Sequence, residues 1–456
     1  MSVPESEELC LDVSGGRSGQ GPATWGQQAI WDAVSVLGDD APRYNVSVGF
    51  ELPAGRPRAA VLEALTRAAR LHESLRTRLL PDGAGGLTQV LDAAGRFPVT
   101  VRGCEREDTE RAGGQLLGEL AALPFDCAGQ WPLRIGLVEA DGLVRYYAMA
   151  LSHTAADGGG LRRLARDVVM LLDGVSPERL RELFPATQPL DQAAYQHSER
   201  GRKRDAASRK YWCAKLSEGP RGLFPPRGER VRDALFPNAV LHSPALLRAV
   251  DHVAAVRGVS GSSVLLAAAA RQISLLGRAP EQLLQVVVNN RFLPGMSQTI
   301  TTLAQEGLFH LRTVDEDFGD LVRRVHMSAL GAYRYASYDK RLLDRDIEEL
   351  RGRLPDLADH SCFFNDTREP ELFRPPAGDT EVPPLERAAE LTTLAWPVEF
   401  PPRKNLSFAM DVVDAPGALE LAMTADSALI PRQDMESFLR GIEDAVVGDA
   451  LATGCV

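Results

Sequence analysis

The sequence lacks the residue patterns on which metal sites and disulfide scaffolds are built. It contains six cysteines, none at Cys-x-x-Cys spacing from another, and its eight histidines include no His-Glu-x-x-His pair. Zinc-binding and disulfide-rich proteins depend on such closely repeated spacings. The sequence therefore predicts reduced cysteines and no metal site.

Other classes of protein are excluded by what is missing. No apolar run approaches the roughly 18 residues that a membrane-spanning helix needs, and Glu5, Glu7 and Glu8 precede any apolar stretch, unlike in a secretory signal. The net charge of −11 disfavours a general nucleic-acid binder, since phosphate affinity comes from clustered lysine and arginine. No Gly-x-x-x-x-Gly-Lys loop and no dinucleotide glycine pattern is present. We expect a cytoplasmic protein with no bound cofactor.

The length and composition predict two globular lobes. With 44% hydrophobic and 25% charged residues the composition is ordinary for a globular protein, and 456 residues exceed the usual single core, so two domains of roughly 200 residues are expected. Residues 1–20 are polar and rich in glycine and serine, which predicts a flexible N-terminus. Prolines interrupt residues 174–189, which predicts a linker. The expected lobes are 21–175 and 176–456.

Apolar periodicity predicts helices alternating with short buried strands, as in an α/β fold. Leu143–Leu151 is short and apolar, as expected of a buried strand, and apolar residues recur at helical spacing from Leu161 to Leu172. Further strands are predicted at 283–289, 405–413 and 418–424, and further helices at 109–122, 244–257, 260–276, 318–336 and 431–447.

The most informative stretch, Ser152–Gly158, lies between that first strand and helix and reads Ser-His-Thr-Ala-Ala-Asp-Gly. His153 is a candidate base, and Asp157 is a candidate fixed charge four residues later. Glycines 158–160 predict a turn in which the backbone comes close to a ligand. The alternative interpretation is a hydrogen-bonded core histidine, because a single His-x-x-x-Asp spacing is common.

Ser152–Gly158 resembles the His-His-x-x-x-Asp-Gly signature of nonribosomal peptide synthetase condensation domains, with Ser152 in place of the first histidine. Other segments resemble motifs of the same family, in the family's order along the chain. They are Thr24–Trp31, Leu71–Arg78, Leu123–Asp126 with Pro132–Arg134, Arg209–Trp212, Val286–Arg291 and Phe363–Asp366. The resemblance therefore covers most of the chain and identifies it as similar to a free-standing condensation domain.

This resemblance implies a fold and an activity. The expected fold is two chloramphenicol-acetyltransferase-like lobes that form a V-shaped pseudo-dimer with a tunnel between them, with a floor loop near 293–307 and a latch near 368–392. The expected activity is an acyltransferase reaction in natural-product biosynthesis. It joins an acyl or aminoacyl thioester, held on the phosphopantetheine arm of a carrier protein, to an amine.

Two other functions remain open. An acyltransferase of the same fold would make an ester from a hydroxyl acceptor, and a non-catalytic relative would recruit carriers or tailoring enzymes. Neither an adenylation domain nor a carrier's serine attachment motif is visible in the sequence. We therefore expect a monomer that stands alone and receives its small-molecule substrates with the help of a separate carrier.

The resemblance also implies roles for individual residues. His153 aligns with the family's second histidine and is expected to act as the base or to orient the nucleophile. Asp157 is expected to be structural and to pair with an arginine, for which Arg76 is the first choice and Arg291 the second. Gly158 would let the pantetheine arm pass, with its N–H as a candidate oxyanion donor.

Two features qualify this interpretation. Ser152 keeps a hydrogen-bond donor and acceptor but loses the volume of an imidazole, so neighbours are expected to fill the space. Residues 200–210 form the densest basic segment of this acidic chain and include Arg202, Lys203 and Arg204. This segment is either a solvated helix face or a docking surface for an acidic carrier.

Overall fold

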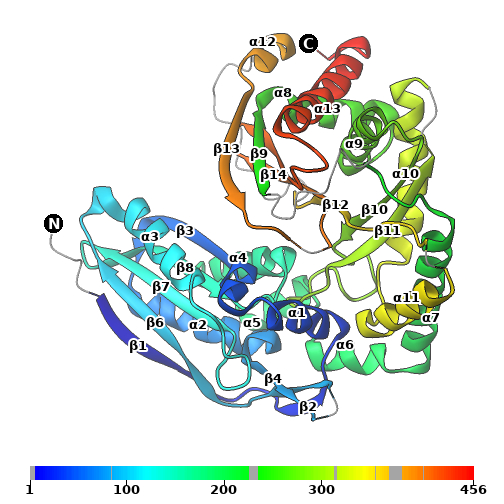
Figure 1. The fold of residues 1–456 in the computed structure, drawn as a ribbon. Coiled ribbons are helices and arrows are strands. Elements are labelled where there is room, and N and C mark those ends of the chain that lie inside the picture. The colour runs from blue at the N-terminus through cyan, green and yellow to red at the C-terminus, as the bar shows by residue number, and fades with distance from the viewer. Residues whose placement is uncertain are drawn as a thin grey trace. The chain divides into compact units, whose positions relative to one another are not determined.

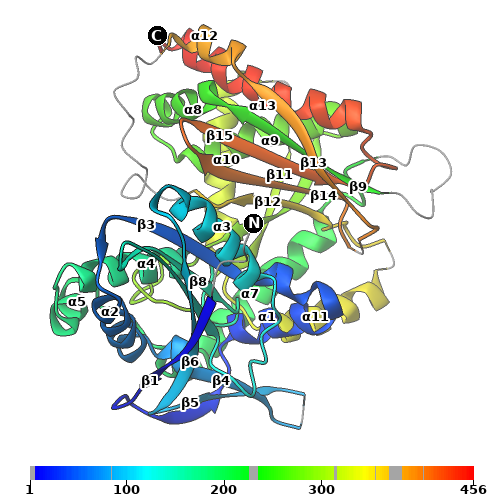
Figure 2. The same ribbon diagram turned by 90° about the vertical axis from the view of Figure 1, so that its left-hand side faces the viewer.

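The computed structural model describes residues 6–83, 85–224, 235–312, 316–354, 356–368, 383–403 and 405–455 (Figures 1 and 2). The chain divides into two units. The first comprises residues 1–204, 289–304 and 339–341, and the second comprises residues 205–288, 305–338 and 342–456. The predicted boundary at 175/176 is therefore wrong. The first unit continues because α5 (Pro177–Leu183) packs against α2 (Arg58–Leu71), and α6 (Pro189–Gln196) packs against β2 (Gly19–Pro22).

A five-stranded sheet forms the framework of the first unit. Its strand order is β1-β6-β7-β8-β3, with bounds Ser6–Val13, Gly95–Gly103, Leu133–Ala140, Leu143–Leu151 and Val46–Arg56. Strand β8 is buried along almost its whole length, as its apolar sequence predicted. The prediction of a flexible N-terminus is wrong for β1, which pairs with β6 from Ser6 opposite Arg102 to Val13 opposite Gly95. Main-chain hydrogen bonds hold β1 at the sheet edge, and composition does not reveal them.

Helices cover both faces of this sheet. Helices α2 and α4 (Gly158–Leu172) pack on one face, and α3 (Thr109–Ala121) packs on the other. A smaller sheet, ordered β2-β5-β4, adds β5 (Leu87–Leu91) and β4 (Thr77–Pro81). The linker predicted at 174–189 is wrong in part, because it contains α5, whose first turn begins at a proline capped by Ser176.

Helix α1 (Trp25–Ser35) begins with a capping box that explains part of the sequence motif there. The Thr24 side chain accepts a hydrogen bond from the backbone of Gln27, and the Gln27 side chain accepts one from the backbone of Thr24. Position 26 requires glycine because the backbone of Thr302 comes close to it. A Cβ at this position would lie 2.2 Å from the carbonyl oxygen of Thr302. The first turn of α1 thereby lies against the segment 289–304.

A seven-stranded mixed sheet forms the framework of the second unit. Its order is β11-β10-β12-β14-β15-β9-β13, with bounds Gln305–Arg312, Glu281–Val288, Cys362–Asp366, Phe408–Ala415, Ala418–Ala425, Phe236–Ser243 and Thr393–Phe400. Leu284 of β10 joins the main core with α8 (Pro244–Arg257), α9 (Gly261–Gly277), α10 (Phe318–Arg334) and α13 (Arg432–Ala452). Leu283 points to the opposite face, where it meets α7 (Glu199–Glu218) and α11 (Lys340–Arg353). Both units are thus mixed α/β, as predicted.

The remaining predictions concern single segments. The predicted helix 244–257 has the same bounds as α8, whereas the predicted helix from Leu161 begins three residues earlier, at Gly158. Of the latch predicted at 368–392, residues 369–382 lie outside the described residues, and 385–390 form the short helix α12 (Leu385–Glu390). No single helix in the described ranges is long and apolar enough to cross a membrane, although α8 and α9 pass this test together as a pair bent by 104°.

Candidate functional site

The Ser152–Gly158 segment connects the end of β8 to the start of α4, within the first unit. Asp157 is the N-cap of α4, and its Oδ1 accepts a hydrogen bond from the backbone N–H of Gly160 at 2.8 Å. Since this cap starts the helix at Gly158, the three glycines form its first turn and not a loop before it. Three residues of the segment, Ser152, Thr154 and Asp157, are buried. The segment is therefore held in place by the residues packed around it.

Asp157 forms a bidentate ion pair with Arg291. Arg291 Nη2 donates to Oδ1 at 2.7 Å and Nη1 donates to Oδ2 at 3.0 Å, and the two side chains are 5% and 4% exposed. The first choice of partner, Arg76, is therefore wrong, and the second choice is the observed one. Arg291 lies 134 residues away along the chain, and tertiary folding alone decides which arginine reaches the carboxylate.

Asp157 also fixes the segment 289–304. Its Oδ2 accepts hydrogen bonds from the backbone N–H groups of Leu303 at 2.9 Å and Ala304 at 3.0 Å. The pKa of Asp157 lies below its ordinary value: burial opposes ionisation, but the Arg291 guanidinium and backbone N–H donors outweigh it. One carboxylate thus joins the Ser152–Gly158 segment, the start of α4 and the segment 289–304.

Glycines at the start of α4 make room for this arrangement. A Cβ at Gly159 would lie 3.0 Å from the Arg291 guanidinium, and one at Gly160 would lie 3.2 Å from the carbonyl oxygen of Thr301. At Gly158, by contrast, a Cβ would make only ordinary contact with Arg162, at 3.6 Å or more. Packing thus explains the second and third glycines but not the first.

Arg76 serves a different purpose from the one predicted. Its side chain is buried and donates to the backbone carbonyls of Ala69 at 2.8 Å and Arg17 at 3.2 Å, and to that of Asp92. Burial lowers the pKa of Arg76, and the carboxylates of Glu73 and Asp92 oppose this effect. Arg76 therefore fastens the 3₁₀ turn Glu73–Arg76 to the neighbouring loops.

His153 is held by its backbone. Its carbonyl oxygen accepts a hydrogen bond from Thr302 Oγ1, and its ring lies 6.4 Å from that of Tyr44, centroid to centroid, at an interplanar angle of 49°. Ring atom Nδ1 is buried and has no hydrogen-bond partner among the described residues. Sequence reasoning missed Thr302, because nothing in the polar run 297–302 marks the one hydroxyl that reaches His153.

Ser152 belongs to a small cluster of hydroxyl and thiol groups. Its Oγ lies 2.8 Å from Thr154 Oγ1 and 3.3 Å from Cys127 Sγ. Cys127 Sγ lies 3.7 Å from Thr154 Oγ1. We call Cys127, Ser152 and Thr154 the hydroxyl–thiol cluster. Side chains from two segments thus contact Ser152; whether they fill the space of the missing imidazole stays a prediction.

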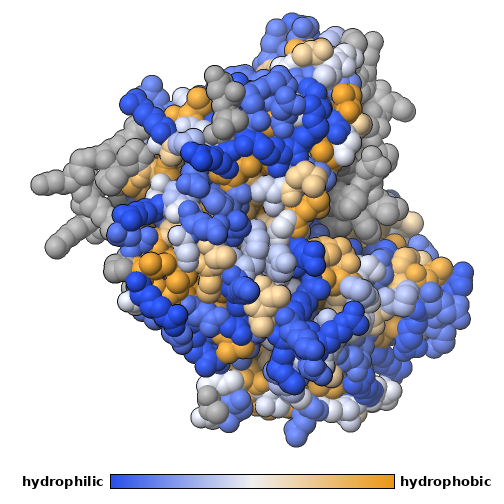
Figure 3. Space-filling view, turned by 90° about the vertical axis from the view of Figure 1, so that its right-hand side faces the viewer, coloured by the Kyte–Doolittle hydropathy of each residue, from blue (hydrophilic) through white to orange (hydrophobic). Residues whose placement is uncertain are grey.

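The basic segment 200–210 lies on α7 and is partly neutralised. Lys203 pairs with Glu199 at 2.7 Å, Arg209 pairs with Asp205 and Asp346, and Arg204 is half-buried. Arg202 and Lys203 remain exposed. Figure 3 shows one face of the molecule, on which hydrophilic and hydrophobic residues are interspersed. In the described parts of the chain no three histidine, cysteine, aspartate or glutamate residues lie close enough together to hold a metal ion.

Comparison with known proteins gives consistent matches. The family model described as Condensation domain matches residues 18–440. The chain is 25% identical over 354 residues to the probable nonribosomal peptide synthetase CymA of Salinispora arenicola, a match that covers 75% of this chain but 4% of that protein. The chain thus spans only a small part of the length of this curated relative.

Solved structures share the fold. The condensation domain of the monacolin K polyketide synthase MokA is 14% identical with a TM-score of 0.72, over 96% of this chain and 98% of that one. SgcC5 of Streptomyces globisporus, solved with a naphthyl ethanediol and sucrose, is 17% identical with a TM-score of 0.65, over 94% and 99% of the two chains. The predicted mixed α/β fold is confirmed.

Proposed function

The chain belongs to the condensation-domain family, and we propose that it forms an amide bond between a carrier-bound acyl or aminoacyl thioester and an amine acceptor. The observation that carries this proposal is the anchoring of the Ser152–Gly158 segment. Thr302 holds the backbone carbonyl of His153, and Asp157 is fixed four residues later, whereas the Nδ1 atom of the His153 imidazole has no partner among the described residues. A rigid backbone that carries an uncommitted imidazole suits a group that meets a substrate.

His153 would handle the proton of the reaction. The amine nitrogen attacks the thioester carbonyl carbon, the C–S bond breaks, and the thiol of the phosphopantetheine arm leaves. The proton lost by nitrogen is the one gained by sulfur, so an imidazole can accept it and return it. Histidine suits this step because one ring nitrogen of a neutral imidazole accepts a proton and the resulting imidazolium can give it back.

Asp157 would act as a positioning residue. Its two oxygens receive five hydrogen bonds, from Arg291, Gly160, Leu303 and Ala304, which leaves no capacity to orient His153 as in a triad. Gly158 would lie beside the pantetheine arm, because packing does not explain its missing side chain. Its N–H, in the first turn of α4, is a candidate donor to the developing oxyanion.

The partner in this proposal is a carrier protein that presents the thioester on its phosphopantetheine arm. Carrier docking through α7 is supported by two exposed basic side chains, Arg202 and Lys203, of which Lys203 is paired with the exposed Glu199. Arg204 contributes less to this surface than the sequence suggested, since it is half-buried. An acidic carrier surface would be attracted to this end of α7 at low ionic strength.

Ester formation is the second candidate. The structurally similar SgcC5 was solved with a diol, so a protein of this fold accommodates hydroxyl groups. An alcohol acceptor would depend more on His153 than an amine would, because a neutral amine is already nucleophilic whereas an alcohol needs its proton removed during attack.

The test uses acceptors of matched shape. Purified protein is incubated with acyl-loaded carrier proteins and either 2-phenylethylamine or 2-phenylethanol, and products are quantified by mass spectrometry. The proposal predicts amide formation that exceeds the background without protein and falls in His153→Ala. Product from the alcohol alone would favour the second candidate. Carrier binding without any turnover would contradict both and favour a recruiting role.

A further inference from the structure

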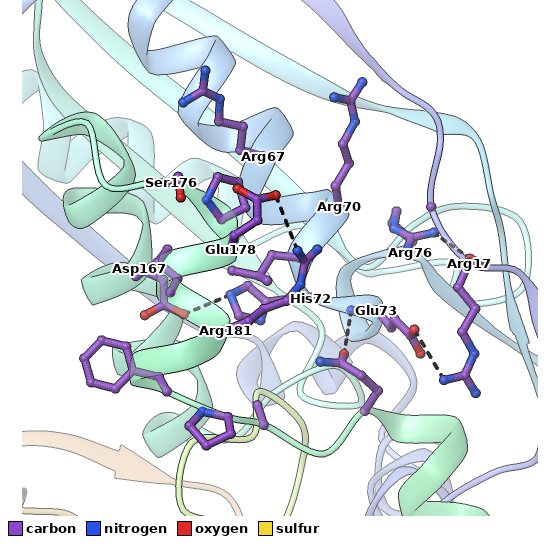
Figure 4. Close-up of a pocket in the computed structure, with 18 of the residues that line it drawn as sticks. Arg17, Arg67, Arg70, His72, Glu73, Arg76, Asp167, Ser176, Glu178 and Arg181 are labelled. Atoms are coloured by element: carbon purple, nitrogen blue, oxygen red, sulfur yellow. Dashed lines mark hydrogen bonds and ion pairs between the residues drawn. The ribbon is translucent and has the colours of Figure 1, made fainter.

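A pocket of about 830 Å³ lies within the first unit, apart from the Ser152–Gly158 segment (Figure 4). It is bounded by the C-terminal end of α2, by α5, by the loop at Gly15–Arg17 and by residues 184–188. Asp167 of α4 contributes to its wall. This volume lies within the usual range of ligand sites, about 300–1,000 Å³.

The lining is rich in guanidinium groups. Five arginines face three carboxylates, which are Glu73, Asp167 and Glu178. Asp167 is already neutralised by Arg166 at 2.7 Å and lies 3.0 Å from His72. The pocket therefore has an excess of positive charge. The five lining arginines are Arg17, Arg67, Arg70, Arg76 and Arg181.

Not all of these arginines are available to a ligand. Arg76 is buried and donates to three backbone carbonyls, Arg17 is held by Asp191 at 2.9 Å, and Arg67 is held by Glu63. Arg70 forms no ion pair within the described part of the chain, and Arg181 has only a distant partner, Glu178 at 3.7 Å, with both side chains exposed. Such exposed pairs contribute little and are easily exchanged. Arg70 and Arg181 are thus the cations that an anion can engage.

The carboxyl group of Glu73, which is buried, is a hydrogen-bond acceptor in a lining rich in arginine donors. The Glu73 side chain is 9% exposed, and its Oε2 atom is buried without a hydrogen-bond partner. Its other oxygen lies 3.7 Å from Arg17 (Figure 4). A buried oxygen with no partner costs free energy that a ligand's donor group would recover. Such an atom in a pocket wall points to a ligand that carries an N–H or O–H group.

Part of the remaining wall is apolar and would receive a hydrocarbon body, while His72, Ser176 and Gln188 add polar groups. The apolar members are Leu71, Pro177, Leu180, Phe184 and Pro185. The Phe184 ring is itself covered by the Arg166 guanidinium, 3.6 Å from its centroid, and is therefore held in place. Charge, an unsatisfied acceptor and an apolar wall lie together around one cavity.

We propose that this pocket binds an organic anion whose carboxylate or phosphate meets Arg70 and Arg181, whose apolar body contacts Leu180 and Phe184, and whose donor group meets Glu73. Guanidinium groups suit both head groups, since their planar donors match carboxylate and phosphate oxygens. This site is independent of the proposed amide-forming reaction.

The binding test uses four probes of similar body in isothermal titration calorimetry. They are 3-phenylpropionate, phenyl phosphate, L-phenylalanine and the neutral 3-phenylpropanamide. We expect both anions to bind, with the tighter one identifying the preferred head group, and the neutral amide not to bind. L-Phenylalanine, which adds an ammonium group to phenylpropionate, should bind more tightly than phenylpropionate. Glu73→Gln should reduce this preference.

Charge reversal provides the control. Arg70→Glu and Arg181→Glu should each weaken anion binding at least tenfold. Arg179→Glu reverses an exposed charge on the same helix α5 that does not line the pocket and should leave binding unchanged. Absence of binding by either anion at 10 mM, equal binding of the neutral amide, or an equal loss in Arg179→Glu would each overturn the proposal.

Discussion

Asp157 and Arg291 form a bidentate ion pair across 134 residues of sequence, and both side chains are more than nine-tenths buried. The pair also connects three segments of the chain, which makes it a structural junction. The same carboxylate accepts hydrogen bonds from the backbone of Gly160, Leu303 and Ala304. Removing one member of a buried pair leaves an uncompensated charge, which is strongly destabilising. The segment that carries His153 therefore depends on a residue remote in the sequence.

This junction gives the first prediction. Asp157→Ala should lower stability by about 3–5 kcal/mol, because Arg291 would remain buried without its counter-charge and the backbone N–H groups of Gly160, Leu303 and Ala304 would lose their acceptor. His153→Ala should cost much less, because the hydrogen bond between its backbone and Thr302 is kept. Thermal melting of the two variants measures the difference. Similar melting temperatures would show that Asp157 does not act as a structural junction.

Catalysis gives the second prediction. If His153 moves the proton, His153→Ala should reduce turnover by about 10²-fold or more with an alcohol acceptor, where deprotonation is obligatory. The loss with an amine acceptor should be smaller, since positioning contributes more there. Carrier binding, measured in parallel, should not change. Undiminished turnover of both acceptors in this variant would exclude the assigned role.

The hydroxyl–thiol cluster gives the third prediction. Ser152→His, which restores the family's signature, should destabilise the protein by about 1–3 kcal/mol, because Cys127 and Thr154 already contact Ser152 and a larger side chain would overpack this site. Adding Cys127→Gly should recover part of the loss by making space. Urea denaturation of the single and double variants measures the coupling. A Ser152→His variant as stable as the wild type would show that the space behind His153 is empty.

Glu73 gives a prediction about pH. Burial raises the pKa of Glu73 above its ordinary value of 4.5, against the attraction of Arg17. The folded protein therefore holds this proton more tightly than the unfolded chain does, so stability falls as the pH rises from 4.5 through the folded-state pKa. Glu73→Gln cannot titrate and escapes this loss. Its melting temperature relative to the wild type should rise across this pH window. A relative melting temperature that falls instead would contradict the direction of the shift.

Carrier docking gives the last prediction. Arg202→Glu combined with Lys203→Glu should weaken association with an acidic carrier at low salt, and the difference should shrink as the Debye length falls below about 8 Å. Arg351→Glu combined with Arg353→Glu reverses two exposed charges at the end of α11 and serves as the control. Surface plasmon resonance across a salt series compares the two. If both double variants weaken carrier association equally, the α7 surface is an ordinary solvated helix face and not a docking site.

The sequence alone determined the element types and the family. The bounds of β8 and α8 follow from apolar runs and periodicity, which depend on nearby residues only. The composition of residues 1–20 and 174–189 gave wrong predictions of a flexible terminus and a linker, because composition too depends on nearby residues only. It does not show that β1 pairs with β6, or that α5 packs on α2, and long-range contacts of this kind override local preference.

Only the tertiary structure decided how the site is held. The sequence marked His153 and Asp157 by their spacing, but two arginines were candidates for the carboxylate, and the less favoured one, Arg291, is the partner. Thr302 and Cys127 carried no local signal at all. Their contacts with His153 and Ser152 form when segments distant in sequence are brought together. Periodicity reports which face of an element is buried, whereas the identity of the group that meets a buried charge is fixed by packing in three dimensions.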